Sequence, residues 1–360
     1  MNELGDIRRK VEAGRRISVE DAVRLYASHD LLEVGALANM VRERLNGDRT
    51  YYVVNRHINH TNVCVNRCRF CAFSRSPDEP GAYTLHLDQV LERARESAKE
   101  GITELHLVGG LHPDLPYSYY RDMIEALHAE LPEVHLQAFT AVEIEYFGRL
   151  ADMSTKETLA DLKQVGLGSL PGGGAEVFAP RVRETICPRK LPGEDWLRIH
   201  REAHELGLRS NATMLYAHVE TDEERADHLR QLRELQDDTG GFMSFIPLAF
   251  HPENTGVTPL RARSGFDDLK NVAVARVFLD KFPHVKSFWI MLGLKVAQVS
   301  LWFGSDDLDG TVVEERITHE AGATTPQSLT REELERLIRD AGRVPVERNT
   351  VYEIVERVTT

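Results

Sequence analysis

The sequence predicts an α/β fold, a TIM-like (β/α) barrel that is either full or partial, with a helical segment on each side of it. From Tyr52 onward, short apolar runs alternate with amphipathic segments of ten to fifteen residues, which is the pattern of repeated βα units. At least six such units fall within roughly 270 residues. This number suits a barrel better than a two-layer open sheet.

The chain before and after the barrel has a different pattern. Residues 1–50 have apolar side chains at helical spacing, for example Ala22 and Leu25, and polar residues between them. Near the other end, Arg331–Ala341 is expected to be one polar helix followed by a short final segment. The expected parts are a helical extension over 1–50, the barrel over 51–322, and a helical tail packed on the barrel over 323–360.

The elements of the barrel follow from the same alternation. Leu87, Val90, Leu91 and Ala94 recur at helical spacing, and Gly101 lies where a helix C-cap is expected. The expected strands are Val53–Ile58, Glu104–Val108, Val134–Ala138, Leu208–Leu215, Phe242–Leu248 and Ser287–Met291. The expected helices are Leu87–Lys99, Tyr119–Glu130, Lys156–Val165, Asp195–Leu206, Asp222–Leu235 and Leu269–Phe282.

Composition limits the classes of function. The chain has 360 residues, 42% of them hydrophobic, so it can bury a substantial core. Its net charge of -13 argues against nucleic acid or an anionic membrane as a partner, because either would repel the surface. No run of about 18 apolar residues occurs, and the N-terminus has no apolar signal region. We therefore expect a cytoplasmic protein.

Three cysteines lie within eight residues, Cys64, Cys68 and Cys71. Thiolates bind soft metals, and a loop with three of them either finds a fourth ligand elsewhere or leaves one metal position open. The spacing is not that of four-cysteine ferredoxins or of paired zinc knuckles. An open metal position would imply chemistry, and a reducing compartment would suit the three clustered thiols.

Other interpretations of the triplet remain open. Cys187 can be a fourth ligand only if the fold brings it back, and it is otherwise an ordinary thiol. His57 and His60 could complete a Cys3His zinc site, which would make the protein a zinc-stabilised binding module. A redox-active cluster without an open position would instead make it an electron carrier.

Unusual residues follow several of the expected strands, where the chemistry of such barrels is found. Two glycines that would let a backbone approach a ligand, Gly109 and Gly110, precede His112. A glycine-rich segment at 168–176 lacks the ending of a P-loop, so it does not predict nucleoside triphosphate binding. The polar or titratable candidates at the strand ends are His112, Thr140, Glu143, Ser169, Glu176, Asn211, Thr213, His218 and His251.

The Cys-x3-Cys-x2-Cys spacing, with Phe70 before the last cysteine, resembles the signature of radical S-adenosylmethionine (SAM) enzymes. The resemblance implies that Cys64, Cys68 and Cys71 bind three irons of a [4Fe-4S] cluster and that SAM chelates the fourth. It implies a SAM-binding role for a Gly-Gly element. The cofactor-binding residues expected on this basis are Phe70, Gly109, Gly110, Thr140, Ser169, Glu176, Asn211 and Thr213.

Longer segments between about Tyr52 and Ala323 resemble the aminodeoxyfutalosine synthases of the futalosine route to menaquinone. These segments are 58–62, 108–113, 139–144, 170–176 and 210–216. Cyclic dehypoxanthinylfutalosine synthase and the deazaflavin-forming synthases share the scaffold and remain alternatives. One departure is at Gly304-Ser305-Asp306, where relatives tend to have Ala-Asn before Asp307.

The resemblance implies a substrate and a reaction. The substrate is 3-[(1-carboxyvinyl)oxy]benzoate, an aryl enol ether with two carboxylates, and SAM is consumed as a co-substrate. The adenosyl radical adds to the double bond, the aryl group migrates, and bicarbonate is lost to give 6-amino-6-deoxyfutalosine. A low-potential electron donor such as flavodoxin or ferredoxin is also implied.

For each role in this reaction, the sequence gives a group of candidate residues. Two substrate carboxylates require cationic or hydrogen-bonding partners. The candidates for this role are Arg56, Arg183, Lys190 and Asn211. A proton must also be moved late in the rearrangement. The candidates for that catalytic role are His112, Glu143, His218 and His251.

Overall fold

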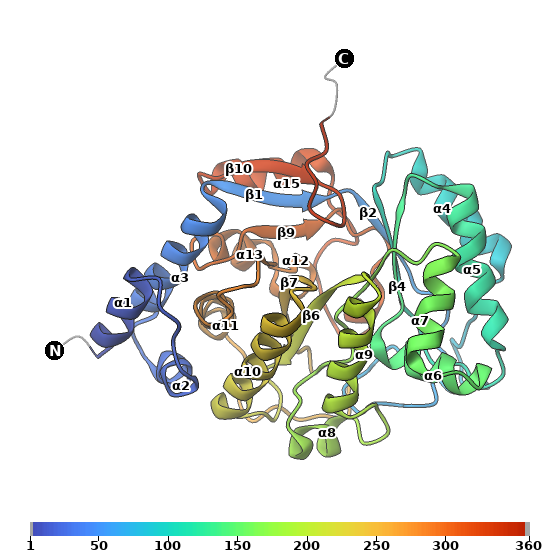
Figure 1. Cartoon of the computed structure of the whole chain (residues 1–360), viewed down its shortest axis with the longest axis horizontal. Helices are drawn as coiled ribbons and strands as arrows, with labels where there is room; N and C mark the ends of the chain where they lie inside the picture. The colour runs from blue at the N-terminus through green and yellow to red at the C-terminus, as the bar shows by residue number, and fades with distance from the viewer. Residues whose placement is uncertain (1–2, 357–360) are drawn as a thin grey trace.

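Seven parallel strands form a curled sheet at the centre of the computed structural model, which describes residues 3–356 (Figure 1). The strands pair in chain order, as successive right-handed βα units do. They are β2 (Asn55–Ile58), β3 (Glu104–Leu107), β4 (His135–Ala138), β5 (Ser169–Leu170), β6 (Arg209–Tyr216), β7 (Phe242–Ala249) and β8 (His284–Val285). Because all seven run the same way, their carboxyl ends meet at one end of the sheet.

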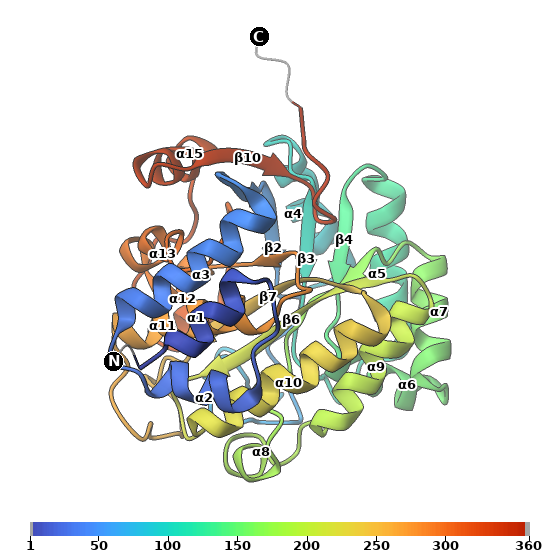
Figure 2. The same cartoon turned by 60° about the vertical axis from the view of Figure 1, so that its left-hand side comes forward.

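Helices cover the outside of the curled sheet (Figure 2). Those that follow the strands are α4 (Leu87–Ala98), α5 (Tyr117–Glu130), α6 (Ala141–Ala151), α7 (Thr155–Gln164), α9 (Gly193–Glu205), α10 (Asp222–Thr239) and α11 (Gly265–Phe278). Shorter helices are α8 (Pro180–Ile186), α12 (Trp289–Leu292), α13 (Leu294–Ser300) and α14 (Ile317–Glu320). Their apolar faces and the outward side chains of the strands form the core, in which Trp196 and Phe242 are fully buried.

A second sheet of three parallel strands has the order β10-β1-β9. Its strands are β1 (Arg49–Val53), β9 (Asp307–Gly310) and β10 (Val344–Arg348). The segment around β9 also reaches both edges of the larger sheet. The Ser287 amide donates to the Asp307 carbonyl (2.8 Å), and the His57 amide donates to the Val313 carbonyl (3.0 Å). The segment 306–313 therefore spans the gap between β8 and β2.

The N-terminal residues form three helices, α1 (Gly5–Glu12), α2 (Val19–Ala27) and α3 (Leu31–Asn46). Helix α2 begins with a capping box, in which the Ser18 hydroxyl accepts from the Asp21 amide and the Asp21 carboxylate accepts from the Ser18 amide. Helix α3 packs on α11, and α2 packs on α10 (Figure 2). Near the other end of the chain, α15 (Arg331–Asp340) precedes β10.

The α/β barrel-like fold is confirmed, and most expected elements occur within a few residues of the expected bounds. One strand is wrong. Residues 287–291 were expected to be extended, but Trp289–Leu292 is the short helix α12, and the strand before it is only His284–Val285. The apolar run suggested a strand because its side chains are buried. Trp289 is buried on a short helix instead, where its indole Nε1 donates to the Gly310 carbonyl (2.9 Å).

Within residues 3–356, further elements were not expected. They are the strands β5, β9 and β10 and the helices α6, α8, α13 and α14. The first expected strand also divides at Val54 into β1 and β2, which belong to different sheets. The three-part division of the chain stays a prediction. Within residues 3–356, no helix is both long enough and apolar enough to cross a membrane.

The packing of α3 against α11 gives a test of stability. Leu37 is fully buried on α3, whereas Leu32 on the same helix is 78% exposed. Leu37→Ala should lower the free energy of unfolding by about 3 kcal/mol, because it leaves a cavity in the core. Leu32→Ala should change it by less than ~0.5 kcal/mol. Urea denaturation followed by circular dichroism measures both, and equal losses would contradict this packing.

Candidate active site

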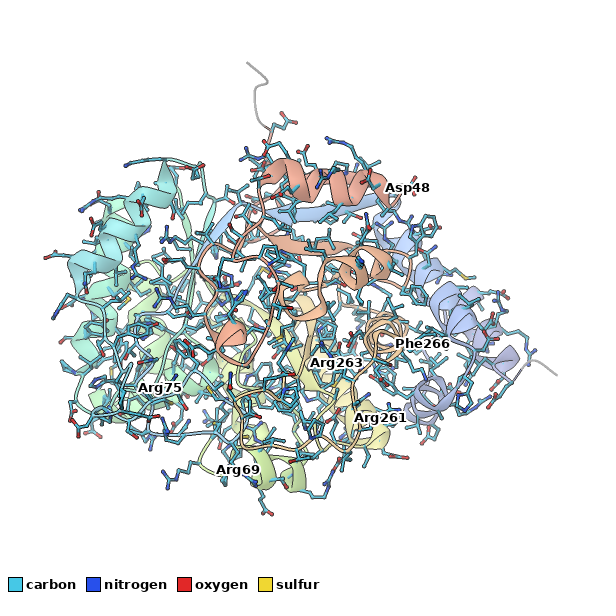
Figure 3. The ribbon with its side chains drawn as sticks, turned by 180° about the vertical axis from the view of Figure 1, so that it is seen from behind. Asp48, Arg69, Arg75, Arg261, Arg263 and Phe266 are labelled. Carbon is cyan, nitrogen blue, oxygen red and sulfur yellow. The ribbon has the colours of Figure 1, made fainter. Side chains whose placement is uncertain are left out.

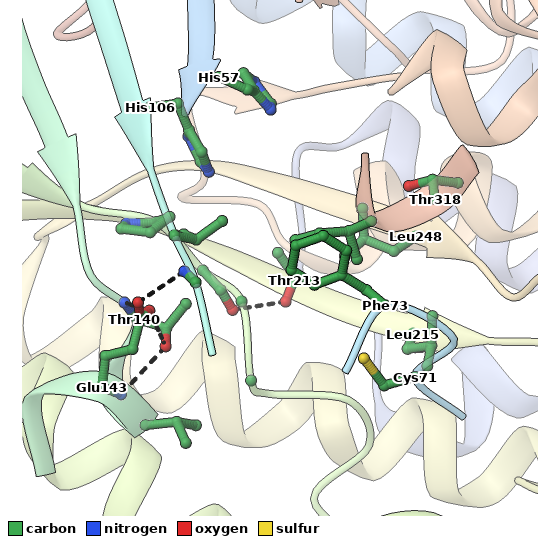
Figure 4. A pocket seen from close by; sticks show the side chains of 18 of the residues that line it. His57, Cys71, Phe73, His106, Thr140, Glu143, Thr213, Leu215, Leu248 and Thr318 are labelled. Carbon is green, nitrogen blue, oxygen red and sulfur yellow. Dashed lines mark hydrogen bonds between the residues drawn. The ribbon is translucent and has the colours of Figure 1, made fainter. Parts of the chain in front are cut away.

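A cavity of about 300 Å³ lies inside the curled sheet and extends to the carboxyl ends of its strands (Figure 4). Its lining comes from the seven strands or the loops that follow them, which include the cysteine loop after β2, and from β9. Apolar side chains such as Phe70, Phe73, Leu215 and Leu248 supply most of its surface, and polar side chains lie among them. A concave, mainly apolar site with polar groups that can orient a ligand is typical of a small-molecule site.

The three clustered cysteines line one end of this cavity, which we call the thiol end. Backbone hydrogen bonds fix their loop, including one from the Cys71 amide to the Cys68 carbonyl (3.0 Å) and one from the Cys64 amide to the Arg75 carbonyl (3.0 Å). All three thiols are free. Burial raises the pKa of Cys68 to about 12 and also raises the pKa of Cys71.

The donor set fits an iron-sulfur cluster. Three soft sulfur ligands from one loop are the ligands that such clusters prefer. Within residues 3–356, no three His, Cys, Asp or Glu side chains converge closely enough to bind one metal ion. Cluster ligands need no such convergence, because each thiolate binds a different iron.

The fold brings Cys187 back toward the cysteine loop. The Arg69 amide donates to the Ile186 carbonyl (2.8 Å), and the Cys187 thiol contributes to the electrostatic environment of Cys68. Cys187 is 1% exposed and is not among the residues that line the cavity. Cys187 is therefore buried next to the loop without lining the cavity.

Gly109 and Gly110 lie where β3 meets the cysteine loop. A Cβ added to Gly110 would lie 2.1 Å from the Val63 carbonyl oxygen, and one added to Gly109 would lie 2.5 Å from the His60 ring. Both contacts are impossible for real side chains. The glycines were expected to admit a ligand, and the structure adds that they let β3 and the cysteine loop approach each other.

Glu143 joins this region to α6. One carboxylate oxygen accepts from the Gly109 amide (3.0 Å), and the other accepts from the amide (2.7 Å) and hydroxyl (2.8 Å) of Thr140. The bond from the Thr140 amide is one half of the capping box of α6, and the other half is the bond from the Glu143 amide to the Thr140 hydroxyl (3.3 Å). Burial raises the pKa of Glu143 to about 7, although these donors oppose the rise.

A buried ion pair lies beside the cysteines. Lys190 Nζ is 2.5 Å from a carboxylate oxygen of Glu176 and 5.0 Å from the centre of the Phe70 ring. Burial alone would lower the pKa of Lys190, but Glu176 and the nearby thiols raise it above its usual range. The lysine is therefore a fixed positive charge at the thiol end.

The structure brings most of the expected cofactor-binding residues together. Those that line the cavity are Phe70, Gly109, Gly110, Thr140, Glu176, Asn211 and Thr213. Ser169 does not line it and instead bonds to His135 Nε2 (2.9 Å) and to the Gln137 amide (3.2 Å). Ser169 therefore supports the wall.

Of the residues expected to move protons, only Glu143 lines the cavity. His218 is bonded to the Leu215 carbonyl (2.9 Å), His251 to the Met291 carbonyl (2.9 Å), and His112 accepts from the Asp114 amide (3.1 Å). Their catalytic roles stay predictions.

Of the four candidates for binding the substrate carboxylates, two line the cavity and two do not. Lys190 and Asn211 line the cavity. Arg56 points outward to Ser97 (2.7 Å) and Glu314 (2.7 Å), and Arg183 donates to the Ala175 carbonyl (2.7 Å).

The opposite end of the cavity has a polar cluster that the sequence analysis missed, and we call it the inner end. Its members on the cavity wall are His57, Glu104, His106, Gln137, Asn211, Lys286 and Asp309. His57 and His106 stack with ring centres 4.4 Å apart (Figure 4). Polar residues at alternate positions of otherwise apolar strands, as in Glu104-Leu-His106-Leu, were the signal that could have revealed it.

Residues 58–232 match the model of the radical SAM superfamily, and residues 239–360 match the CofH/MqnC C-terminal region. The chain is 50% identical to the aminodeoxyfutalosine synthase of Thermus thermophilus, over 96% of this chain and 94% of the relative. It is 48% identical to the enzyme of the same name from Streptomyces coelicolor, over 97% and 93%.

Relatives with other names are also similar. A 5-amino-6-(D-ribitylamino)uracil–L-tyrosine 4-hydroxyphenyl transferase of Methanopyrus kandleri is 42% identical, over 92% of this chain and 91% of the relative. A cyclic dehypoxanthine futalosine synthase of Streptomyces coelicolor is 39% identical, over 98% and 88%. Among solved structures, methylornithine synthase has a TM-score of 0.76 at 17% identity, over 94% of this chain and 97% of that one, which supports the fold.

The buried carboxyl of Glu143 predicts a dependence of stability on pH. Because its pKa in the folded protein is about 7, against 4.5 for an exposed glutamate, the protonated form stabilises the fold fully below pH 4.5. That contribution is lost as the pH rises through 7. Between pH 5 and pH 8 the wild type should lose up to ~3 kcal/mol more unfolding free energy than Glu143→Gln, which cannot ionise.

Urea denaturation at several pH values, without SAM, measures this difference. Glu157→Gln is the matched control, because Glu157 occupies the same position in the capping box of α7 but is exposed. Its stability curve should stay parallel to the wild type over this range. If the stability curve of Glu143→Gln were also parallel to that of the wild type, the raised pKa of Glu143 would be contradicted.

Proposed function

The chain belongs to the radical SAM superfamily, and we propose that within it the protein is an aminodeoxyfutalosine synthase that acts on 3-[(1-carboxyvinyl)oxy]benzoate. The observation that carries this proposal is the 50% identity to an enzyme of that name over nearly the whole of both chains. The relatives with other names are 42% and 39% identical.

Enzymes of this superfamily use a [4Fe-4S] cluster and SAM. When bound, the two together supply a 5'-deoxyadenosyl radical. In this chain Cys64, Cys68 and Cys71 would bind the cluster, because they line one end of the cavity together. Gly109, Gly110, Thr140 and Glu176 line the same cavity and would bind SAM beside them.

The remaining side chains of the cavity would bind and orient the enol ether. Phe73, Leu215 and Leu248 supply apolar surface for the aromatic ring and keep water from a reactive radical. Glu143 would hold or move a proton, since it lines the cavity and its pKa is about 7. Glu143 is favoured for this role over His112, His218 and His251, because those histidines do not line the cavity.

An electron donor is part of the proposal. Arg69, which adjoins Cys68, is exposed and donates to the Gly256 carbonyl (3.1 Å), so the cysteine loop and the loop that bears Arg261 meet at the surface (Figure 3). Exposed arginines close to the cysteines suit an acidic low-potential donor such as flavodoxin or ferredoxin. A cytoplasmic location would supply such a donor.

The reaction is tested by its products. Anaerobically reconstituted protein, with a strong reductant, should consume SAM only when the aryl enol ether is present. Mass spectrometry should detect 6-amino-6-deoxyfutalosine and methionine. Free 5'-deoxyadenosine without an adduct would contradict the addition reaction and favour the reactions named for the other relatives, which can be tried with their own substrates in the same assay.

The cluster ligands are tested by iron content. Cys68→Ala should abolish cluster assembly, because only two thiolates of the loop remain. Cys187→Ala should leave the iron and sulfide content of the reconstituted protein unchanged, because Cys187 lies outside the cavity. Equal loss of iron in the two variants would make Cys187 a ligand and would contradict an open iron position.

A further inference from the structure

The cavity has two lysines at its two ends. Among the described residues that line it, Lys190 and Lys286 are the only lysines or arginines. Lys190 lies at the thiol end, over the Phe70 ring. Lys286 lies at the inner end, next to Asp309 (3.1 Å). The proposed substrate likewise has two carboxylates, one on the reacting double bond and one on the ring.

The two ends are separated along the strands. His57, His106 and Gln137 are register partners on β2, β3 and β4, so they form one level of the wall. Gly109 follows His106 by three residues, and a strand rises about 3.3 Å per residue, so the two levels lie roughly 10 Å apart. Figure 4 shows His57 and His106 well away from Cys71.

The inner end has hydrogen-bonding capacity left over. The Lys286 ammonium has three N–H donors. Within residues 3–356, its only side-chain hydrogen bond goes to the Asp309 carboxylate. Lys286 is 3% exposed, so water does not satisfy the other donors freely. One carboxylate oxygen of Glu104 is also buried without a partner, but it is an acceptor, so it would pair with a donor and not with a carboxylate. Burial lowers the pKa of His57, so its imidazole is neutral and can donate one hydrogen bond.

The shape of the substrate decides which carboxylate reaches this end. The vinyl carbons must lie at the thiol end, where the adenosyl radical forms. The ring carboxylate is separated from them by the ether oxygen and three ring carbons. Building on the proposed function, we propose that Lys286, positioned by Asp309 and flanked by His57, binds the ring carboxylate of the substrate.

Lys286 is then a specificity-determining residue. The ring carboxylate does not react, so a contact with it orients the ring without taking part in the bond changes. Asp309 is the positioning residue. Its backbone is in the left-handed region (φ 65°), and its amide donates to the Asp307 carboxylate (2.5 Å), which fixes the carboxylate that faces Lys286. A compound without the ring carboxylate would leave the lysine donors unpaired.

The test compares two compounds, the enol ether substrate and 2-phenoxyacrylate, which lacks only the ring carboxylate. Wild-type protein should favour the substrate by ~30-fold or more in kcat/KM, as expected for a buried charged pair. Lys286→Met should lose this preference by slowing the carboxylated compound and leaving the other little affected. Lys281→Met, a lysine that is 56% exposed, is the matched control and should change neither value.

Direct binding gives a second measurement. Calorimetric titration with the substrate should give a Kd at least ~30-fold higher for Lys286→Met than for the wild type. Because this change leaves Asp309 buried without its partner, the double variant Lys286→Met with Asp309→Asn removes both charges and should show the same loss of preference. Iron content and circular dichroism report whether each variant folds.

The outcomes distinguish a failure of the Lys286 assignment from a failure of the proposed function. If the wild type forms no adduct with either compound, the proposed function fails and this assignment falls with it. If the wild type forms the adduct but folded Lys286→Met slows both compounds equally, or keeps the preference, the function stands. Lys286 is then not the partner of the ring carboxylate.

Discussion

The segment 306–313 is the constraint on which the cavity depends, because it connects the two edges of the curled sheet. Buried ion pairs hold it in place. Arg348 Nε is 2.7 Å from the Asp307 carboxylate, and Arg276 is paired with Asp306, and all four side chains are fully buried. A buried charge without a partner would be strongly destabilising, so these pairs permit few other positions for the segment. Asp309 lies two residues after Asp307, and its carboxylate thereby faces Lys286 (3.1 Å).

Chemically, the cavity differs from one end to the other. Sulfur ligands and glycines lie at the thiol end, where close approach of the backbone and soft ligands matter. The Lys190–Glu176 ion pair lies at that end too, whereas the inner end is lined by charged and hydrogen-bonding side chains from different strands or the segments that follow them. This order suits a ligand whose reactive part and whose anionic part are far from each other. It also separates the reactive chemistry from the groups that select the substrate.

The sequence predicted the thiol end far better than the inner end. Cys64, Cys68 and Cys71 are neighbours in the chain, so their spacing alone shows that they act together. Lys286 and His57 are more than 200 residues apart, and only the curl of the sheet and the segment 306–313 bring them together. The same reason explains the missed strands β9 and β10, which are short and gain their stability from pairing with β1. Helix α12 was mistaken for a strand because a short buried apolar run has no distinguishing period.

The position of Lys286 also bears on how one scaffold serves several reactions. Relatives that are 42% and 39% identical over nearly the full chain have names that imply other substrates. A cofactor that the superfamily shares supplies the same radical to each and cannot select among substrates. Selection must then come from the side chains around the remainder of the cavity. In this chain one such group is the buried Lys286, which has unused donors and comes from the region 239–360 that matches the CofH/MqnC C-terminal model. That region supplies β7, β9 and the segment after β8 to the wall of the cavity, so it is as much a part of the site as the cysteine loop.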